Sequence, residues 1–317
     1  MRIFKFLLIV ILSLVSIQAF SGEQRMEKLI TLKDGLTLWS EAFGKPTDPP
    51  ILLIMGAMNQ GIFWPDEFCG ELAKAGHYVI RYDHRDTGKS STLDFQKHPY
   101  DLNDLTRDAV AVLHGHGVSK AIIVGLSMGG YVAQLMAVDY PDVVERLILI
   151  STTADQRPYM AATMGQAHEK FSLPDPGEKL LAYLRNTVAN PPNNAAEMEE
   201  NMLQGWAVTY GGNVAFPREQ LAKTLSLSAA RAANPSSAFN HALAVAHSSE
   251  RLESIKKIKV PALIIHGKYD VCFPLEHGHY LAQNIPKSQL IILEMGHSFM
   301  WSASDEVLSS ILGFIKN

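Results

Sequence analysis

Cysteine is scarce in this chain. Cys69 and Cys272 are the two cysteines among 317 residues, and they lie far apart in the sequence. Two such residues cannot form a disulfide framework, and without a Cys-x-x-Cys pair they offer no thiolate metal site. Each lies in an apolar neighbourhood that is typical of a buried free thiol, so we expect both to be unpaired.

An excess of charge of one sign is also lacking. The chain has 28 Lys and Arg against 32 Asp and Glu, a formal net charge of -4 at pH 7. Because no basic stripe occurs, nucleic acid is not an expected partner. A hydrophobic content of 47% with 19% charged residues is ordinary for a globular protein and argues against disorder. The length suits one large domain with an insertion rather than two independent domains.

The first residues differ from the rest. Two basic residues precede an unbroken apolar run over 6–12, and small residues, Ala19 and Ser21, stand at positions -3 and -1 of a cleavage site after Ser21. This pattern predicts a signal peptide over 1–21 followed by a mature domain over 22–317. The run is short for a transmembrane helix, although an uncleaved anchor is the alternative. We therefore expect a secreted or periplasmic protein without stable membrane insertion after cleavage.

Strand-like and helix-like segments alternate along most of the chain. A hairpin pattern, 28–32 and 36–43, is followed by apolar runs at 51–55, 78–82, 121–124, 147–150, 262–265 and 290–293. Stretches with helical periodicity lie at 65–74, 102–114, 128–140, 275–284 and 300–315. The alternation predicts an α/β fold with a mostly parallel eight-stranded sheet flanked by helices.

The alternation stops between about 155 and 247, where prolines, Ala, Met and Gln are frequent and no strand-like run occurs. We interpret this stretch as a helical lid inserted between two strands, above the strand ends where ligands bind in open α/β sheets. Its Met and aromatic side chains either line an apolar substrate cavity or pack within the lid itself: Tyr159, Met160, Met164, Phe171, Met198, Met202, Trp206 and Tyr210.

A five-residue motif, Gly125-Leu126-Ser127-Met128-Gly129, joins the 121–124 run to a helix-like stretch. Gly-x-Ser-x-Gly between a strand and a helix is typical of a serine nucleophile held on a strained turn. The glycines permit the close approach of strand and helix that such a turn needs. Since a five-residue match also arises by chance, the rest of the chain must supply a base and an acid.

His297 and Asp270 are the candidates for these roles. His297 follows the last predicted strand and would take the proton of the serine hydroxyl. Asp270 follows the preceding predicted strand and would orient the imidazole. The order Ser127, Asp270, His297, with each residue after the carboxyl end of a strand, is the order found in α/β-hydrolases. Asp155 is the alternative acid.

The remaining histidines are expected to have packing or surface roles. His266, His277 and His279 lie near Asp270 in the sequence, and His114 is paired with His116 in a second His-Gly-His motif. No carboxylate–histidine set with metal-ligand spacing accompanies them. We therefore expect neither a metal nor another cofactor.

An oxyanion hole needs two backbone donors near the serine. One is the N–H of Met128, directly after Ser127, and the other is expected from Ala57 in the turn that follows the 51–55 run. Two fixed N–H dipoles supply much of the rate of acyl transfer, and losing one typically costs ~3 kcal/mol.

Four segments together carry a resemblance to a known family: 53–57, 64–68, 80–90 and 124–129. With them, the chain resembles the α/β-hydrolase superfamily from Lys28 onward and, more narrowly, the aclacinomycin methylesterase group. In that group a serine, an aspartate and a histidine hydrolyse a carboxylic methyl ester on a polyketide. The resemblance weakens over 155–247, and Ala57 replaces a glycine that is common in the family. The Asp and Arg residues of 81–90 are expected to pin the loop after the fourth strand.

The sequence therefore predicts a serine hydrolase that cleaves a carboxylic ester of methyl or small-alcohol type through an acyl-enzyme, with a small-molecule ester as its partner. Carbon–carbon bond hydrolases, lactonases and cofactor-free perhydrolases or haloperoxidases use the same three residues and are alternatives. A non-catalytic small-molecule-binding protein on the same scaffold is another. Haloalkane dehalogenases and epoxide hydrolases are disfavoured because they need aspartate at the position of Ser127.

Overall fold

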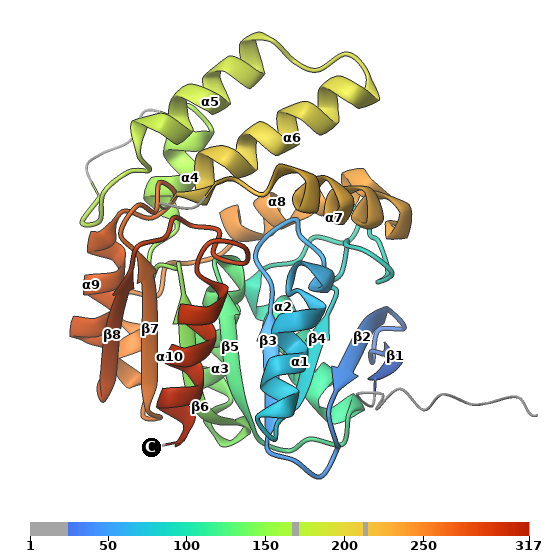
Figure 1. Cartoon of the computed structure of the whole chain (residues 1–317), viewed down its shortest axis with the longest axis vertical. Helices are drawn as coiled ribbons and strands as arrows, with labels where there is room; N and C mark the ends of the chain where they lie inside the picture. Colours follow the sequence, from blue (N-terminus) through green and yellow to red (C-terminus); the bar gives the residue numbers. More distant parts are fainter. Residues whose placement is uncertain (1–24, 167–170, 212–214, 317) are drawn as a thin grey trace, which may run out of the picture.

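The computed structural model describes residues 25–166, 171–211 and 215–316 (Figure 1). The expected signal peptide, residues 1–21, lies outside the described residues. The described strands are β1 Arg25–Thr31, β2 Thr37–Phe43, β3 Pro50–Ile54, β4 Tyr78–Tyr82, β5 Ala121–Leu126, β6 Val144–Ile150, β7 Ala262–Gly267 and β8 Ser288–Leu293.

The helices of the described residues are α1 Asp66–Lys74, α2 Leu102–Gly115, α3 Met128–Asp139, α4 Arg157–Thr163, α5 Glu178–Ala189, α6 Ala195–Tyr210, α7 Arg218–Arg231, α8 Asn240–Ala246, α9 Leu275–Asn284 and α10 Ser304–Lys316. Short 3-10 turns lie at η1 Gly61–Phe63, η2 Pro141–Val143, η3 Pro235–Phe239 and η4 Ser254–Lys257.

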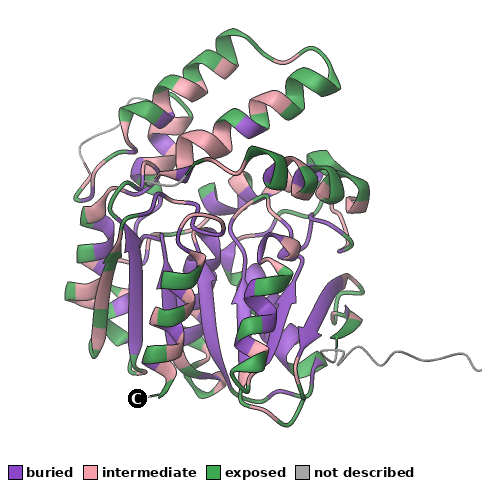
Figure 2. Cartoon of the chain, viewed as in Figure 1, coloured by how far each residue is buried: buried purple, intermediate pink, exposed green. Residues whose placement is uncertain are grey.

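The eight described strands form one sheet in the order β1-β2-β4-β3-β5-β6-β7-β8. The β1–β2 hairpin joins β4 in antiparallel pairing, and every pairing from β4 to β8 is parallel. The central strands are largely buried because helices cover both of their faces, as Figure 2 shows. The predicted fold class, a mostly parallel eight-stranded sheet flanked by helices, is confirmed.

Alternate side chains of each strand enter two separate cores. Leu52 and Ile54 of β3 face the core that α2, α3 and α9 cover, whereas Ile51 and Leu53 face the core that α1 and α10 cover. This alternation is the period-two geometry of a strand buried on both sides. The two cores fix the strand ends from which the candidate site residues extend.

Helices α4 to α8 lie between β6 and β7, in the stretch that the sequence assigns to a lid. Figure 1 shows α5 and α6 above one end of the sheet, with α7 and α8 close to the strands. We call α4 to α8 the helical insertion. Among the described residues, none of the helices combines the length and the apolar character needed to cross a bilayer.

The last helix begins later than its periodicity predicts, at Ser304 rather than near Met300. The preceding residues form a turn in which Phe299 accepts the backbone N–H groups of Ser302 and Ala303. The carbonyl oxygen of Trp301 accepts a hydrogen bond from the hydroxyl of Tyr210 in the insertion, at 3.0 Å. The apolar residues before Ser304 therefore hold the insertion instead of extending the helix.

Candidate active site

Ser127 lies at the sharp turn between β5 and α3. Its φ of +54° and ψ of -121° belong to a region that residues other than glycine rarely adopt. The turn is possible because glycines surround it: a Cβ on Gly129 would lie 2.1 Å from the carbonyl oxygen of Ile54, and one on Gly125 would lie 2.3 Å from that of Gly129. The hydroxyl of Thr152 donates to the carbonyl oxygen of Ser127 at 2.7 Å. The surrounding structure thus holds the strained conformation in place.

The turn after β3 lies against this serine. A Cβ on Gly56 would come within 3.2 Å of the Ser127 Cβ and 3.7 Å of its Oγ. Among the described residues, the backbone N–H groups of Ala57 and Met128 have no hydrogen-bond acceptor. Buried N–H groups without a partner are uncommon in a folded protein, and here one belongs to the residue after Ser127 and the other to the turn that lies against it. The two N–H groups are therefore available to donate hydrogen bonds to an oxygen atom of a molecule bound at Ser127.

His297 and Asp270 contact each other directly. The Nδ1 of His297 lies 2.9 Å and 3.1 Å from the two carboxylate oxygens of Asp270. One of those oxygens also accepts the backbone N–H groups of Cys272 and Phe273, at 2.8 Å and 2.9 Å. Because a carboxylate can only accept in this pairing, Nδ1 carries a proton and Nε2 is left free to act as a base.

The charges of this pair shift both pKa values. Burial acts to lower the pKa of His297, but the charge and the hydrogen bond of Asp270 raise that pKa well above its ordinary value. Burial acts to raise the pKa of Asp270, and the charge and hydrogen bond of His297 bring it below its ordinary value. The pair thus favours an imidazolium next to a carboxylate, which is the state that forms when His297 takes a proton from a nucleophile.

The hydroxyl of Ser127 makes no hydrogen bond to any described residue, His297 included. Hydrogen bonds between nucleophile and base are often long in ligand-free enzymes and tighten when substrate binds. The structure therefore brings Asp270 and His297 together and places the turn of Ala57 beside Ser127. A hydrogen bond from Ser127 to His297 is not formed.

The other candidates have different partners. Asp155 forms an ion pair with Arg157 at 2.8 Å. His277 lies 2.7 Å from the hydroxyl of Thr153, and His266 donates to the carbonyl oxygen of Phe273 at 2.8 Å. Each of these contacts has a structural role away from Ser127.

The described residues include one group of three potential metal ligands. Asp270, Cys272 and His297 offer ligand atoms that lie within 4.8 Å of one another. Two of these atoms, however, are already paired as histidine and carboxylate, and burial raises the pKa of the Cys272 thiol, which favours its protonated form. A cation at this place would have to displace the hydrogen bond that orients His297. The arrangement suits proton transfer better than metal binding.

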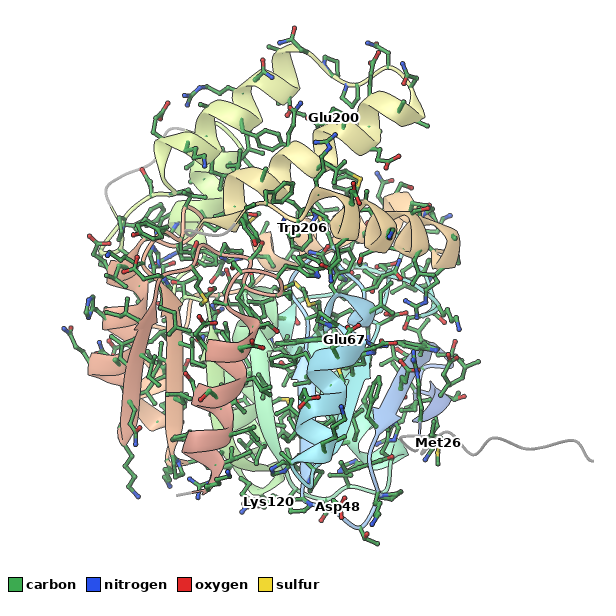
Figure 3. The ribbon with its side chains drawn as sticks, in the orientation of Figure 1. Met26, Asp48, Glu67, Lys120, Glu200 and Trp206 are labelled. Carbon is green, nitrogen blue, oxygen red and sulfur yellow. The ribbon has the colours of Figure 1, made fainter. Side chains whose placement is uncertain are left out.

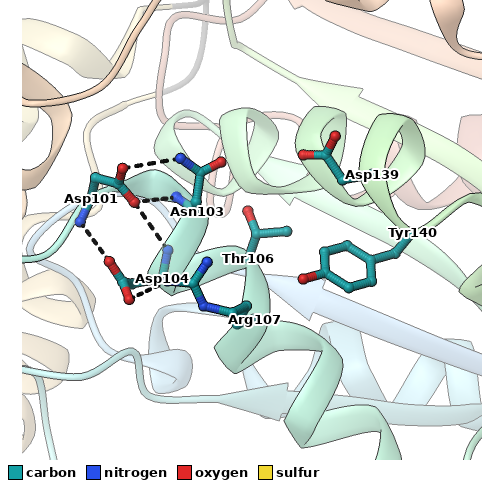
Figure 4. Close-up of a pocket in the computed structure, with 7 residues that line it drawn as sticks. All are labelled: Asp101, Asn103, Asp104, Thr106, Arg107, Asp139 and Tyr140. Carbon is teal, nitrogen blue, oxygen red and sulfur yellow. Dashed lines mark hydrogen bonds and ion pairs between the residues drawn. The ribbon is translucent and has the colours of Figure 1, made fainter.

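A separate surface hollow of about 340 Å³ lies at the far end of α3 (Figure 4). Its lining residues, several of them hydrogen-bonded to one another, are Asp101, Asn103, Asp104, Thr106, Arg107, Asp139 and Tyr140. Since Ser127 precedes the first turn of α3 and Asp139 ends it, about 18 Å of helix separates this hollow from the serine. It is not part of the candidate site.

Aromatic side chains join the insertion to the sheet domain near the site. Trp206 of α6 stacks on Phe63 with a centroid distance of 5.2 Å and an interplanar angle of 4°. It also meets Trp301 at 5.8 Å, so that it points from α6 toward the strand ends, as Figure 3 shows. Of the lid residues singled out from the sequence, Trp206 and Tyr159 therefore pack, whereas the side chains of Met164, Met198 and Met202 are exposed.

The comparisons with known proteins agree with this geometry. A family model described as the alpha/beta hydrolase fold matches residues 49–304. The chain belongs to the alpha/beta hydrolase family. It is 33% identical over 291 residues to rhodomycin D methylesterase DnrP of Streptomyces peucetius, which covers 90% of this chain and 96% of that protein.

Two further proteins are similar to this chain. A 2-hydroxy-6-oxononadienedioate/2-hydroxy-6-oxononatrienedioate hydrolase of Burkholderia vietnamiensis is 28% identical, covering 77% of this chain and 78% of its own. The esterase EaEST from Exiguobacterium antarcticum superimposes with a TM-score of 0.71 at 22% identity, covering 92% and 100% of the two chains, and shows the fold. The resemblance to α/β-hydrolases of the methylesterase group is confirmed.

The sequence did not indicate that the loop of His297 is hydrogen-bonded to the end of helix α6. The backbone N–H groups of His297 and Ser298 donate to the carbonyl oxygen of Thr209, and that of Gly296 donates to Tyr210. These two carbonyl groups end helix α6 of the insertion. Two glycines are the local signals: a Cβ on Gly296 would lie 2.4 Å from both carbonyl oxygens, and one on Gly211, directly after α6, would lie 2.7 Å from the Cα of Gly296.

Proposed function

We propose that this α/β-hydrolase is a serine esterase that cleaves a carboxylic ester through an acyl-enzyme. The observation that carries the proposal is the pair of acceptor-free N–H groups, of Ala57 and Met128, beside the strained Ser127. Such donors suit the negative oxygen of a tetrahedral intermediate.

In the proposed reaction, Ser127 Oγ attacks the ester carbonyl carbon while Nε2 of His297 takes the hydroxyl proton. The N–H groups of Ala57 and Met128 hold the oxyanion, and Asp270 stabilises the imidazolium. The intermediate collapses when the C–O bond to the alcohol breaks and His297 gives its proton to the departing oxygen. Water then attacks the acyl-enzyme with His297 as base, which releases the acid and restores the serine.

For the substrate, we propose a carboxylic ester of methanol or another small alcohol with a larger apolar acyl part. The identity to a rhodomycin D methylesterase along most of both chains supports the methyl ester. The acyl part would lie beneath the helical insertion, where Trp206 and Tyr159 bring aromatic surface toward the strand ends. The identity to a dienedioate hydrolase favours a second candidate, hydrolysis of a carbon–carbon bond beside a ketone, by the same three residues.

The direct test compares the wild-type protein with Ser127→Ala. We expect the wild type to react covalently with a fluorophosphonate and to hydrolyse p-nitrophenyl acetate, and the variant to do neither while it keeps its melting temperature. Ser309→Ala, on the exposed surface of α10, is the matched control and should behave as the wild type does. Turnover that survives in Ser127→Ala would exclude this nucleophile.

A substrate panel separates the two candidate reactions. Methyl esters of aromatic acids and vinylogous diketones are offered at equal concentration to the wild type and to Ser127→Ala. A kcat/KM for the diketone above that for every ester would replace the esterase proposal by the second candidate. Labelling by the fluorophosphonate without turnover of either class would favour a binding protein.

We also propose that the protein is exported, which rests on the residues of 1–21 alone. Expression of the full chain in a bacterial host, followed by mass determination of the extracellular or periplasmic product, tests this. A product that begins at Gly22 is expected, and a full-length product retained in the cell would contradict it.

A further inference from the structure

The turn that carries Ala57 is held at both ends by buried imidazole rings. At the start of the turn, Nε2 of His84 lies 3.0 Å from the carbonyl oxygen of Met55. At its end, the backbone N–H of Met58 donates to Nδ1 of His241 at 2.9 Å. Both histidines are fully buried. The segment between these two anchors contains Gly56, where a Cβ would lie 3.2 Å from that of Ser127, and Ala57, whose N–H has no acceptor among the described residues.

The partners of His241 fix its tautomer. A backbone N–H can only donate, so Nδ1 of His241 must be unprotonated where it meets Met58. The carbonyl oxygen of Arg85 can only accept, so Nε2, at 2.9 Å from it, must carry the proton. The ring is therefore neutral, in agreement with burial, which lowers its pKa. The ring thus bridges two backbone groups. A proton on Nδ1 would break the hydrogen bond from Met58, and loss of the proton from Nε2 would break the one to Arg85.

The bridge also stabilises an unusual backbone conformation. Met58 has a φ of +64°, in the left-handed region that costs a non-glycine residue about 1 kcal/mol or more. The hydrogen bond to His241 takes up the N–H of Met58, which leaves the preceding N–H, that of Ala57, as the donor on the serine side. The conformation that frees Ala57 is thus tied to the contact with His241.

The rest of the 81–90 segment supports this bridge. The guanidinium group of Arg85 makes two hydrogen bonds of 2.7 Å to the carboxylate of Asp108. These bonds hold Arg85 in place, and its carbonyl oxygen accepts the hydrogen bond from His241. The rings of His84 and His241 pack edge to face with a centroid distance of 5.5 Å. His84 comes from the loop after β4 and His241 from α8 of the insertion. Two distant segments therefore meet on one side of the oxyanion turn.

We propose that His241, supported by His84, is a positioning residue that holds the turn of Ala57 in its donating conformation and links the helical insertion to the oxyanion hole. The role rests on the proposed esterase function. His241 does not reach the reacting atoms; it acts through Met58 on the N–H that stabilises the transition state. Any displacement of α8 would then weaken transition-state stabilisation before it affects substrate binding.

Two amide substitutions separate the two halves of the bridge. In His241→Asn, the side-chain oxygen takes the place of Nδ1 and can accept from Met58, whereas in His241→Gln the amide nitrogen takes the place of Nε2 and can donate to Arg85. His241→Ala removes both. We expect kcat for p-nitrophenyl acetate to fall about 10-fold to 100-fold in the Gln and Ala variants with little change in KM, and to stay within about 5-fold of the wild type in the Asn variant.

A readout that does not depend on turnover completes the test. Hydrogen–deuterium exchange of the peptide that contains Met58 should be faster in the Gln and Ala variants and close to wild type in the Asn variant. His114→Ala, an exposed histidine of α2, is the control for general effects. If the wild type has no esterase activity, the proposed function fails, and the exchange pattern still decides whether His241 holds the turn.

Equal kcat values for the Asn and Gln variants would overturn the proposal. So would equal exchange rates in these two variants, or a loss of kcat that follows only the fraction of unfolded protein. A merely structural histidine would lower the melting temperature of all three variants without the ordered difference in kcat.

Discussion

The carbonyl oxygen of Thr209, at the end of helix α6, accepts the backbone N–H of His297 at 2.9 Å. The candidate base is therefore held from two sides: Asp270 orients its ring, and the helical insertion holds its backbone. The neighbouring N–H of Gly296 donates in the same way to Tyr210 at 3.0 Å. The last carbonyl groups of a helix lack partners within the helix, so the loop of His297 serves as the cap of α6.

Gly296→Ala tests this contact. A Cβ at position 296 would lie 2.4 Å from the carbonyl oxygens of Thr209 and Tyr210, so the loop and the end of α6 must separate. We expect kcat to fall at least about 10-fold, because a displacement of His297 by about 1 Å is costly to catalysis. Steady-state esterase kinetics and circular dichroism measure the effect.

Gly313→Ala is the matched control for that substitution. A Cβ at position 313, in α10, would meet no atom within 4 Å. Alanine is the better helix former by about 1 kcal/mol, so this variant should be at least as stable as the wild type and fully active. Full activity in Gly296→Ala as well would show that the loop tolerates separation from α6.

Asp270→Asn is expected to change both the rate and its pH dependence. The neutral imidazole is the form that acts as base, so wild-type activity is lost as the pH falls through the raised pKa of His297. Removing the carboxylate charge removes the largest of the effects that raise this pKa, and the acidic limb of kcat/KM should move to lower pH. Loss of the correct tautomer should lower kcat by about 10⁴-fold.

Asp155→Asn distinguishes the alternative acid. Asp155 is buried and pairs with Arg157, so its replacement should reduce stability while the acidic limb stays where it is in the wild type. Profiles of kcat/KM between pH 5 and 9 for both variants provide the measurement. A limb that moves in Asp155→Asn and not in Asp270→Asn would reverse the assignment.

Removal of the positive charge of Arg85 should destabilise the fold. Arg85 and Asp108 are both buried, and Arg85→Met leaves the Asp108 carboxylate without its partner. The free energy of unfolding at pH 7 should fall by about 3–5 kcal/mol, and the double variant Arg85→Met/Asp108→Leu should recover part of this loss. Urea denaturation of the three proteins measures both effects.

The destabilisation in Arg85→Met should also depend on pH. Burial already raises the pKa of Asp108 in the wild type, and without Arg85 the folded state favours the protonated carboxyl still more. A group whose pKa is raised on folding stabilises the fold below its unfolded pKa and loses that contribution as the pH rises. The difference between Arg85→Met and wild type should therefore be smaller near pH 4 than at pH 7. A loss that does not vary with pH would mean that the carboxylate finds another partner.

The sequence predicted the sheet and the candidate site residues because their signals are local. An apolar run such as 121–124 is recognisable by itself, and Ser127, Asp270 and His297 each follow such a run. The bridge from Met58 to His241 spans 183 residues, and no periodicity in either segment indicates that they meet. The start of α10 was misjudged for the same reason: Trp301 fits a helical pattern, but its carbonyl oxygen bonds to a distant tyrosine.

The methionines of the insertion show a further limit of sequence reasoning. Met198, Met202 and Trp206 lie four residues apart in turn, so they share one face of α6. Composition alone makes them equivalent as apolar residues, yet the two methionine side chains are 49% and 44% exposed, while Trp206 stacks on Phe63. The difference arises from where the helix meets η1, which is a property of the assembled chain.

Trp206→Ala should alter the choice of acyl chain. Phe63, on which Trp206 stacks, follows the oxyanion turn by only a few residues, so the indole lies between the insertion and the proposed ester site. Long acyl chains would lose apolar contact with it, whereas acetate is too short to reach. The ratio of kcat/KM for p-nitrophenyl octanoate to that for p-nitrophenyl acetate should fall about 10-fold, which corresponds to about 1.4 kcal/mol. Val188→Ala, on the exposed side of α5, should leave the ratio unchanged. If Trp206→Ala lowers both rates by one common factor, the indole supports the fold of the insertion, and the acyl chain must be recognised elsewhere.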